Sequence, residues 1–444
     1  MRPYLKTIIV DTETPISLFE KVAKPNEYAF LLESAETNHP FGRYSFIGFE
    51  PMALKVFPQG GSKNPLTELQ KEFEAIKYEP TSELPSLQAG FVGYFTYETV
   101  RHFETLNLPI DLNSIPEGIF FLPKYLIIFD HFARNITLVA YSPEELETLT
   151  QNVLNKTSLR DLRAVPMEKT ADALGDRGSG NEHFEALVKT AQERVTAGEV
   201  FQIVLSQQFD VKTSLAPFEI YRRLRVISPS PYLYYLQYPD FSIVGSSPET
   251  LVRTEHDEVI IRPIAGTRRR GETPEETARL EAELLNDEKE QAEHMMLVDL
   301  GRNDVGRIAK PGTVRVTRLM EPERYSHVIH LVSEVRGKRR EDASLFDVFR
   351  AAFPAGTLTG APKIRAMEII AELEEKPRDI YGGAVGYFDL SGNMDFAIAI
   401  RTMICKDGNV TLRAGAGIVY DSLPKHEHKE CCNKARGPLT AAIL

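Results

Sequence analysis

The chain is poor in cysteine. Cys405, Cys431 and Cys432 are the three that it has, and the last two are adjacent. An odd count with an adjacent pair fits neither a disulfide framework nor zinc ligation by spaced cysteines. Free thiols are typical of proteins in a reducing compartment, so we expect a cytoplasmic protein.

Positive charge and long apolar runs are also scarce. The 444 residues include 52 Lys and Arg against 63 Asp and Glu, which gives a formal net charge of -11. This charge repels a phosphate backbone or an anionic membrane at long range, so we expect neither nucleic acid nor a membrane as a partner. The apolar stretch before Asp11 is only a few residues long, so we expect no signal peptide, and no other run is long enough to cross a bilayer.

Signatures of nucleotide binding are missing as well. The chain holds neither G-x-x-x-x-G-K-[ST] nor a G-x-G-x-x-G with a later acidic residue, which argues against a phosphate-binding loop. The remaining composition, 42% hydrophobic and 26% charged, is that of an ordinary globular protein. Its length allows two domains or one large unit.

The coarse organisation points to two parts. Short β-branched and aromatic runs separated by turn residues predict a strand-rich first third, followed by a helix over 141–155. The stretch 165–182 is polar, contains glycine and lacks periodicity. We therefore place a boundary there, with one domain over 1–165 and a second over 183–444.

The second part mixes helices and strands. A helix is predicted over 183–198 and a strand over 200–211. The runs 382–390, 394–405 and 409–421 are separated by loops of hairpin length, which favours antiparallel pairing over βαβ winding. We predict an α+β fold, in which large antiparallel β-sheets form a sandwich-like core with helices packed outside.

The most informative motif is a repeated pair of glutamates. Glu290 and Glu293 form one pair, and Glu427 and Glu430 form the other. A spacing of three residues puts both carboxylates on one face of a helix. If the two helices meet, four oxygen donors surround one small volume, as a magnesium ion that also holds an anion requires. The alternative is that each pair lies on a solvated helix surface.

Other residues are weaker candidates when taken alone. Gly266 and Thr267 form a strand-to-loop junction where a ligand can approach the backbone, but many ordinary turns look the same. His330 alternates with apolar residues, which favours a hydrogen-bonded histidine at the margin of a sheet. Arg401 lies in a nearly apolar strand, so its guanidinium needs an anionic ligand, a water-filled cleft or a structural carboxylate.

Six motifs in order resemble those of the chorismate-utilising enzymes. They are PIAGT, AEHMMLVDLGRNDVGR, SHVIHLVSEVRG, FPAGTLTGAPKIRAME, YGGAVGYF, and AGAGIVYDS with a following E-x-x-E-x-x-x-K. The resemblance covers nearly all of residues 183–436, and six ordered motifs are far more specific than any one of them. It implies that residues 183–444 form a chorismate-binding catalytic domain.

Two positions separate the reactions of this family. Where isochorismate and salicylate synthases have a lysine base that activates water, this chain has Gln202, and a neutral amide cannot take that proton. Where aminodeoxychorismate synthases read PIKGT, the chain has Ala265. It therefore resembles the anthranilate synthase component I group, lyases that convert chorismate and ammonia to anthranilate and pyruvate in the first committed step of tryptophan biosynthesis. An aminodeoxychorismate synthase component I and a catalytically inactive tryptophan-binding regulator are the alternatives.

The resemblance also implies a role for each candidate residue. Glu293 and Glu430 would bind Mg²⁺ directly, with Glu290 and Glu427 holding its waters. Glu249 would be the general acid for departure of the ring hydroxyl, which predicts burial and a raised pKa. The other residues implied in catalysis are His330, Thr267 and Lys434, and those implied in substrate binding are Gly266, Thr267, Thr357, Tyr381, Arg401, Gly415 and Gly417.

The N-terminal region fits the same resemblance. The segments implied to bind tryptophan as feedback inhibitor are Leu32, Glu33 and Ser34 with Pro231, Tyr232 and Leu233, which makes residues 1–165 a regulatory domain that also contacts a partner. A simple strand end is the alternative for the first segment. Because no cysteine lies in a glutaminase-like motif, the resemblance implies a glutamine amidotransferase subunit as ammonia source, in a heterotetramer. The C-terminal sequence departs from the family, and Gly437 and Pro438 predict the end of a helix there.

Overall fold

The computed structural model describes residues 1–35, 40–154, 181–324 and 328–443. The helices are α1 (Pro15–Val22), α2 (Pro65–Ala75), α3 (Pro143–Leu154), α4 (Glu182–Thr196), α5 (Pro217–Ile227), α6 (Pro274–Leu285), α7 (Glu288–Gly306), α8 (Leu345–Ala352), α9 (Lys363–Leu373) and α10 (Pro424–Ala442), with short 3-10 turns η1 (Pro40–Arg43), η2 (Tyr97–His102) and η4 (Gly356–Leu358). The strands are β1 (Tyr4–Ile9), β2 (Ala29–Glu33), β3 (Tyr44–Phe57), β4 (Gly90–Phe95), β5 (Gly118–Asp130), β6 (Asn135–Ala140), β7 (Gln202–Lys212), β8 (Tyr232–Gln237), β9 (Ser242–Ser247), β10 (Thr250–Glu255), β11 (Glu258–Ile261), β12 (Ile264–Arg269), β13 (Arg315–Arg324), β14 (Val328–Lys338), β15 (Gly360–Ala361), β16 (Ala384–Asp389), β17 (Met394–Ile398), β18 (Thr402–Lys406) and β19 (Asn409–Ile418).

The strands form one branched sheet whose pairings, in the part of the chain described, are all antiparallel. One arm runs β1-β6-β5-β3-β2-β8-β9-β18-β19-β7-β15. The second arm leaves the start of β5 through β4-β16-β17-β10-β11-β14, and β14 also pairs with β12 and β13. The branch exists because β5 pairs with β4 near its start and with β6 near its end.

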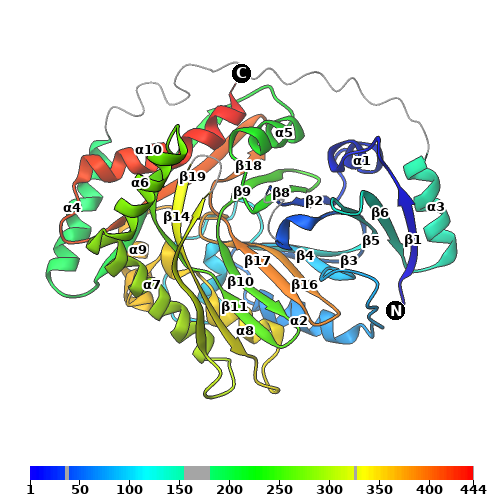
Figure 1. Cartoon of the computed structure of the whole chain (residues 1–444), viewed down its shortest axis with the longest axis horizontal. Helices are drawn as coiled ribbons and strands as arrows, with labels where there is room; N and C mark the ends of the chain where they lie inside the picture. Colours follow the sequence, from blue (N-terminus) through cyan, green and yellow to red (C-terminus); the bar gives the residue numbers. More distant parts are fainter. Residues whose placement is uncertain (36–39, 155–180, 325–327, 444) are drawn as a thin grey trace.

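Alternation along the strands builds a layered core. On β4, Val92 and Tyr94 pack in a cluster made largely of strand residues from both arms, which also holds Phe30 of β2 and Ile243 of β9. Phe91 and Phe95, which point the opposite way, pack in a second cluster with α7 and α8. A third cluster joins the outer face of the first arm to α4, α5, α9 and α10. The apolar faces of the two arms thus meet inside, and helices cover the outer faces (Figure 1).

The predicted α+β fold with antiparallel sheets and outer helices is confirmed, and three local expectations are corrected. Residues 44–57 read in the sequence as two of the short runs of the first third, YSFIGF and ALKVF, but they form one long strand, β3, which has a register shift between Pro51 and Ala53. The run 394–405 is broken into β17 and β18, so Arg401 lies in the break, with φ of +50°, and not inside a strand. Such a conformation costs a non-glycine residue free energy and is typical of functional sites.

The helix α10 does not end at Gly437 and Pro438 as predicted. It continues to Ala442 with Pro438 inside it. An interior proline removes one helical hydrogen bond at a cost of about 3 kcal/mol or more. Pro438 and Leu439 are both buried, and Leu439 packs in the core cluster next to α5. Burial of one leucine stabilises by roughly 1.5–3 kcal/mol, so core packing largely offsets the lost hydrogen bond.

Strands from both predicted domains pair directly. β2 pairs with β8 and β4 pairs with β16, so the first 165 residues and the rest of the chain share one sheet. Most of the stretch predicted as a boundary, 165–182, lies outside the described residues. The two-domain division stays a prediction. A search of the described helices finds none that is long and apolar enough to cross a membrane.

Candidate active site

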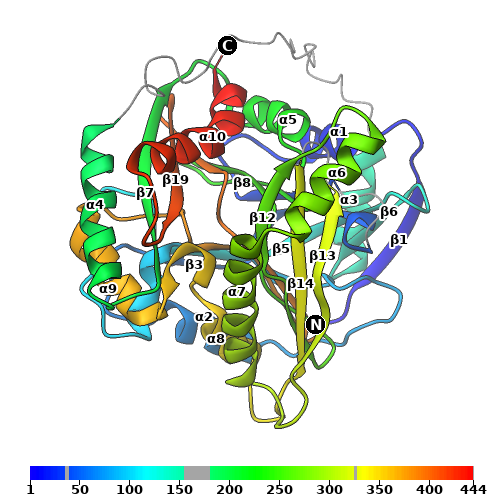
Figure 2. The same cartoon turned by 60° about the vertical axis from the view of Figure 1, so that its left-hand side comes forward.

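One cavity of about 790 Å³ is lined by residues of β7, β12, α7, β14, β19 and α10. Figure 2 shows α7 alongside β12 and α10 alongside β19. All residues that the sequence assigned to substrate, catalysis or metal line this cavity: Glu249, Gly266, Thr267, Glu290, Glu293, His330, Thr357, Tyr381, Arg401, Gly415, Gly417, Glu427, Glu430 and Lys434. The fold therefore brings them together, while their individual roles stay predictions.

The two glutamate pairs lie on separate helices that face this cavity. α7 begins after Asp287, whose side chain accepts hydrogen bonds from the backbone N–H groups of Lys289 and Glu290. α10 begins with Pro424 at its first position, where the missing N–H has no cost. Both spacings of three residues are therefore helical, as expected.

Neighbouring strands hold the carboxylates of α7. Arg268 Nη1 donates to Glu290 Oε1 at 2.9 Å, and Gln202 Nε2 donates to Glu293 Oε1 at 3.0 Å. In this arrangement no group of three His, Cys, Asp or Glu side chains within the described ranges converges closely enough to hold a metal ion. The four glutamates share one cavity but are turned toward protein donors.

Burial and mutual repulsion act on these carboxyl groups. Burial is the main cause that raises the pKa of Glu293; the hydrogen bond from Gln202 opposes it, and the charges of Glu290 and Glu430 add to it. Burial also raises the pKa of Glu427, with a further contribution from Glu430. The two pairs are thus close enough to repel each other, which is the electrostatic setting that a divalent cation relieves.

Lys434 lies one helical turn after Glu430. Its Nζ is 2.7 Å from Glu430 Oε1 and donates to the carbonyl oxygen of Gly415 at 2.9 Å. Both charged side chains are about half exposed, 47% and 48%. Lys434 therefore joins α10 to β19 and offsets part of the negative charge at the cavity.

Glu249 is buried next to the start of β10, with 8% of its surface exposed. Burial raises the pKa of its carboxyl group to about 8, against the opposing effects of Thr357, Lys434 and Arg401. Thr357 Oγ1 donates to Glu249 Oε1 at 3.1 Å. The expected burial and raised pKa are confirmed, and a carboxyl group with this pKa keeps its proton near neutral pH.

His330 lies on β14, opposite Thr267 of β12. Its Nδ1 is 3.0 Å from Thr267 Oγ1 and 3.1 Å from the carbonyl oxygen of Gly266. Because a carbonyl only accepts, Nδ1 carries the hydrogen in the second contact. Burial lowers the pKa of His330 to about 4, so the imidazole is neutral at pH 7.

Gly266 lies at a register shift in the pairing of β12 with β14 and contacts both His330 and Glu290. The register of β12 against β14 shifts between Ala265 and Thr267, and Gly266 has φ of +70°. A Cβ atom on Gly266 would lie 3.1 Å from Glu290 Oε2. Glycine therefore suits this backbone conformation, and any other side chain would also push the Glu290 carboxylate aside by a few tenths of an ångström.

Gly415 and Tyr381 are in direct contact. A Cβ atom on Gly415 would lie 2.4 Å from the hydroxyl oxygen of Tyr381, so only glycine leaves room for that hydroxyl. Arg401 lines the same cavity and is largely buried, and its guanidinium makes no hydrogen bond or ion pair with any residue that the structure describes. Burial lowers the pKa of Arg401 from its usual range, against the effect of Glu249. A buried guanidinium in this state attracts an anionic ligand.

A buried ion cluster behind Tyr381 was not predicted from the sequence. Glu374 accepts hydrogen bonds from Arg378 Nη2 at 2.7 Å and from Arg413 Nη2 at 3.2 Å. Arg378 lies 5.5 Å from the ring centre of Tyr381, and Arg413 lines the cavity. Glu374 thus joins both arginines beneath the cavity, and the carboxyl group of Asp379 also interacts with Arg413. Arg413 lies in an otherwise apolar strand. The same pattern singled out Arg401 and could have indicated this cluster.

The six residues implied to bind tryptophan line a separate cavity of about 270 Å³. Glu33 of β2 lies opposite Leu233 of β8, so the two predicted segments are cross-strand neighbours. The Glu33 carboxylate accepts hydrogen bonds from the Tyr221 hydroxyl at 2.6 Å and from Arg225 Nη2 at 2.9 Å, which fixes this strand end against α5. Tyr232, also in the lining, donates to Asp395 Oδ1 at 2.9 Å.

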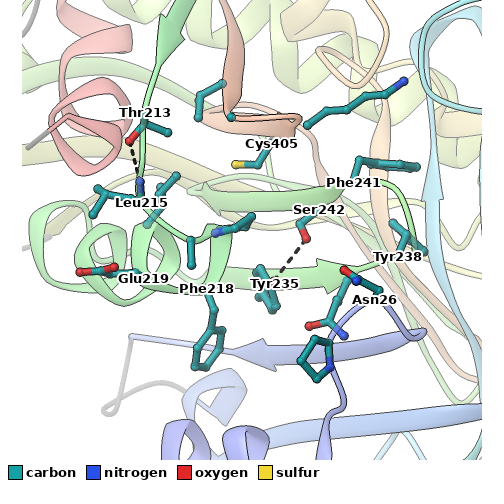
Figure 3. A pocket seen from close by; sticks show the side chains of 18 of the residues that line it. Asn26, Thr213, Leu215, Phe218, Glu219, Tyr235, Tyr238, Phe241, Ser242 and Cys405 are labelled. Carbon is teal, nitrogen blue, oxygen red and sulfur yellow. Dashed lines mark hydrogen bonds between the residues drawn. The ribbon is translucent and has the colours of Figure 1, made fainter. Parts of the chain in front are cut away.

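A larger hollow, of about 920 Å³, lies away from all of these residues (Figure 3). Its labelled side chains include Phe218, Tyr235 and Cys405, and the Tyr235 and Ser242 hydroxyls are 3.2 Å apart. None of the residues predicted to act on a ligand lines it. Volume alone therefore does not mark the site, whereas the chemistry of the lining does.

Comparison with known proteins decides the family. Residues 27–440 match the family model described as chorismate binding enzyme. This chain belongs to the chorismate binding enzymes. The resemblance drawn from the six motifs is thereby confirmed, and it extends to the N-terminal part of the chain.

Individual chorismate binding enzymes match over almost the whole chain. Anthranilate synthase component 1 of Acetivibrio thermocellus is 44% identical over 469 aligned positions, which cover 99% of this chain and 94% of the relative. The crystal structure of anthranilate synthase component I from Streptococcus pneumoniae has a TM-score of 0.77 at 37% identity, covering 97% of this chain and 99% of that one. The menaquinone-specific isochorismate synthase of Escherichia coli, with a TM-score of 0.74 at 19% identity over 99% of this chain and 95% of that one, shows the shared fold alone.

Proposed function

We propose that this chain catalyses the anthranilate synthase reaction, in which chorismate and ammonia give anthranilate and pyruvate. One observation carries the proposal: every residue assigned to the reaction lines a single cavity in which position 202 is an amide and position 265 an alanine. An amide cannot activate water, and alanine lacks the amine of the aminodeoxychorismate synthases. Full-length similarity to anthranilate synthase component 1 supports the same reaction.

Chorismate would be held by its two carboxylates. Arg401, Tyr381 and the backbone N–H of Gly417 would bind the carboxylate of the enolpyruvyl side chain. The buried guanidinium of Arg401, which pairs with no residue that the structure describes, supports this assignment. Fixing both carboxylates orients the ring for attack at carbon 2.

Glu249 would supply the proton for departure of the hydroxyl at carbon 4. Ammonia adds at carbon 2 as this hydroxyl leaves as water, so a protonated acid is needed. A carboxyl group with a pKa of about 8 is protonated at neutral pH, and Thr357 fixes its orientation. In the second step the ring loses a proton and pyruvate departs. The neutral His330, oriented by Gly266 and Thr267, would assist there.

Mg²⁺ is the expected cofactor, and the residues fit it. Four carboxylates from α7 and α10 line one cavity, and burial, with a further contribution from their mutual repulsion, raises the pKa of Glu293 and Glu427. Glu293 and Glu430 would hold the ion directly, and Glu290 and Glu427 its waters. Glu290 and Glu430 would have to turn from Arg268 and Lys434. When bound, the ion supplies charge neutralisation for the ring carboxylate of chorismate.

A separate glutamine amidotransferase subunit would supply ammonia. The relatives' name, component 1, implies a partner component. All three cysteines of this chain are buried, so none is placed as a glutaminase nucleophile. The proposal includes a heterotetramer of the two kinds of subunit, and free ammonia should replace the partner in an assay.

The decisive experiment is incubation of the isolated chain with chorismate, an ammonium salt and Mg²⁺. We expect anthranilate fluorescence to rise together with stoichiometric pyruvate, which a coupled lactate dehydrogenase assay measures. Aminodeoxychorismate that accumulates without pyruvate would assign the chain to the aminodeoxychorismate synthases. Tryptophan binding without any turnover would make it an inactive regulator.

The smaller cavity would bind tryptophan as a feedback inhibitor. Leu32, Glu33 and Ser34 with Pro231, Tyr232 and Leu233 line it, and its volume of about 270 Å³ suits an amino acid with a large side chain. A short route leads from there to the catalytic acid. The Tyr232 hydroxyl is 2.8 Å from Thr250 Oγ1, and Thr250 follows Glu249 in the chain.

Ser34→Leu should relieve tryptophan inhibition while kcat stays within about twofold of the wild type. The added side chain fills part of the pocket, so the ligand loses both space and a hydrogen-bonding hydroxyl. Inhibition curves for anthranilate formation measure the effect, with the exposed Ser62→Leu as matched control. Superimposable curves for Ser34→Leu and the wild type would remove this pocket from the proposal.

A further inference from the structure

The side chain of Gln202 bridges two elements that carry site residues. Gln202 is the first residue of β7 and is buried, with 7% of its surface exposed. Its Nε2 donates to Glu293 Oε1 of α7 at 3.0 Å. We infer that Gln202 is a positioning residue that holds the Glu293 carboxylate in place for a divalent cation and so sets the affinity for that cation. The inference rests on the proposed function, because it presupposes a cation at Glu293.

Gly417 makes room for this contact. A Cβ atom on Gly417 would lie 2.4 Å from Gln202 Nε2 and 3.5 Å from its Cδ, so the amide lies directly over this glycine. Approaches under about 3 Å do not occur between a real Cβ and a neighbouring heavy atom, and a methyl group there would displace the amide. Glycine is thus needed at position 417 to leave space for the Gln202 amide, in addition to any contact with the substrate.

Strand pairing fixes the backbone at Gln202 on one edge and the backbone that follows it on the other. β7 pairs with β19 along ten residue pairs, from Ile203 opposite Ile418 to Lys212 opposite Asn409. On its other edge, Gln202 lies opposite Ala361 of β15. A side chain that starts from such a backbone has few positions available. It can therefore restrain the more mobile carboxylate of a helix.

The contact of Gln202 with Glu293 differs from the contacts that Glu290 and Glu430 make, because the Gln202 amide is uncharged. Glu290 is paired with Arg268 and Glu430 with Lys434, so a positively charged side chain already offsets each of their charges. The amide of Gln202 restrains Glu293 without cancelling its charge. Hydrogen-bonded partners of metal ligands commonly set metal affinity by about 10- to 100-fold.

The test is cation affinity measured without substrate. Isothermal titration of the full chain with Mg²⁺, or with Mn²⁺ as a probe, should give a Kd about 10- to 100-fold weaker for Gln202→Met than for the wild type. Methionine matches the shape of glutamine but cannot donate. Gln208→Met on the same strand is the control, because Gln208 is exposed and contacts Asp210. The control should bind as the wild type does.

A kinetic measurement separates positioning from general damage. For Gln202→Met, the Mg²⁺ concentration that gives half-maximal activity should rise by the same factor, while kcat at saturating Mg²⁺ changes little. Gly417→Ala keeps the amide but displaces it, so its cation affinity should fall as well, and this variant decides if Gln202→Met fails to fold. Wild-type affinity in Gln202→Met would overturn the inference. A wild-type chain that binds neither cation would instead overturn the proposed magnesium site.

Discussion

Glu249→Gln should lower kcat by about 10²- to 10⁴-fold, the usual contribution of a general acid. The amide keeps the size and hydrogen-bonding ability of the buried side chain but has no proton to give to the departing hydroxyl. Thr357 can still hold it, because its hydroxyl can donate to the amide oxygen as it does to Glu249 Oε1. Anthranilate formation from chorismate and an ammonium salt measures the effect.

The matched control is Glu255→Gln at the other end of β10, where the side chain is 41% exposed. It should change kcat less than about twofold, as expected for a surface substitution away from the chemistry. KM for chorismate should stay near the wild-type value in both variants. Full activity of Glu249→Gln would show that another group protonates the leaving hydroxyl.

The same carboxyl group predicts the pH dependence. Burial raises the pKa of Glu249 to about 8, and the protonated form is the active one. Activity should therefore fall as pH rises through about 8, and the residual activity of Glu249→Gln should lack this limb. Glu249 also makes the free energy of unfolding depend on pH, because in the folded chain it keeps a proton that it loses near pH 4.3 in the unfolded chain. This contribution to stability is fully present below that pH and is lost as pH rises to about 8.

The fold class could be predicted because local patterns and tertiary structure agree. Period-two alternation on β4 separates Val92 and Tyr94 from Phe91 and Phe95, and each set enters a different core layer. The end of α10 could not be predicted. Proline at 438 is a local stop signal, but burial of Leu439 against the core favours a longer helix. The free energy of that burial follows only from the packed structure.

The site was predictable to the extent that helical spacing and motif order determine it. The i,i+3 glutamate pairs face one cavity, as their spacing requires. The donors that hold them did not follow from any motif, because Gln202 and Arg268 lie far from Glu293 and Glu290 in the sequence. The positive φ of Arg401 was hidden for a similar reason. The alternation of residues 394–405 reads as one strand, and the break appears only when β17 and β18 pair with different neighbours.

Glu430→Gln should weaken cation binding by more than the loss of an outer hydrogen-bonded partner does, which is typically about 10- to 100-fold. Turnover should disappear at limiting Mg²⁺. The substitution keeps the size of the side chain but removes a charged oxygen donor, the kind that Mg²⁺ prefers. Glu427→Gln, on the same helix face, should lose only about 10- to 100-fold, because this residue is expected to hold the waters of the ion. Isothermal titration and Mg²⁺ activation curves measure both variants.

Stability should separate the loss of cation binding from a loss of fold. The ion pair of Glu430 with Lys434 is about half exposed, with side-chain exposures of 48% and 47%. Such surface pairs contribute about 0–1 kcal/mol, so the thermal unfolding of Glu430→Gln without metal should stay close to that of the wild type. Added Mg²⁺ should raise Tm in the wild type and much less in the variant, because a ligand that binds only the folded state stabilises it in proportion to its affinity. Undiminished activity of Glu430→Gln at limiting Mg²⁺ would remove this glutamate from the metal site and leave Glu293 as the residue to test.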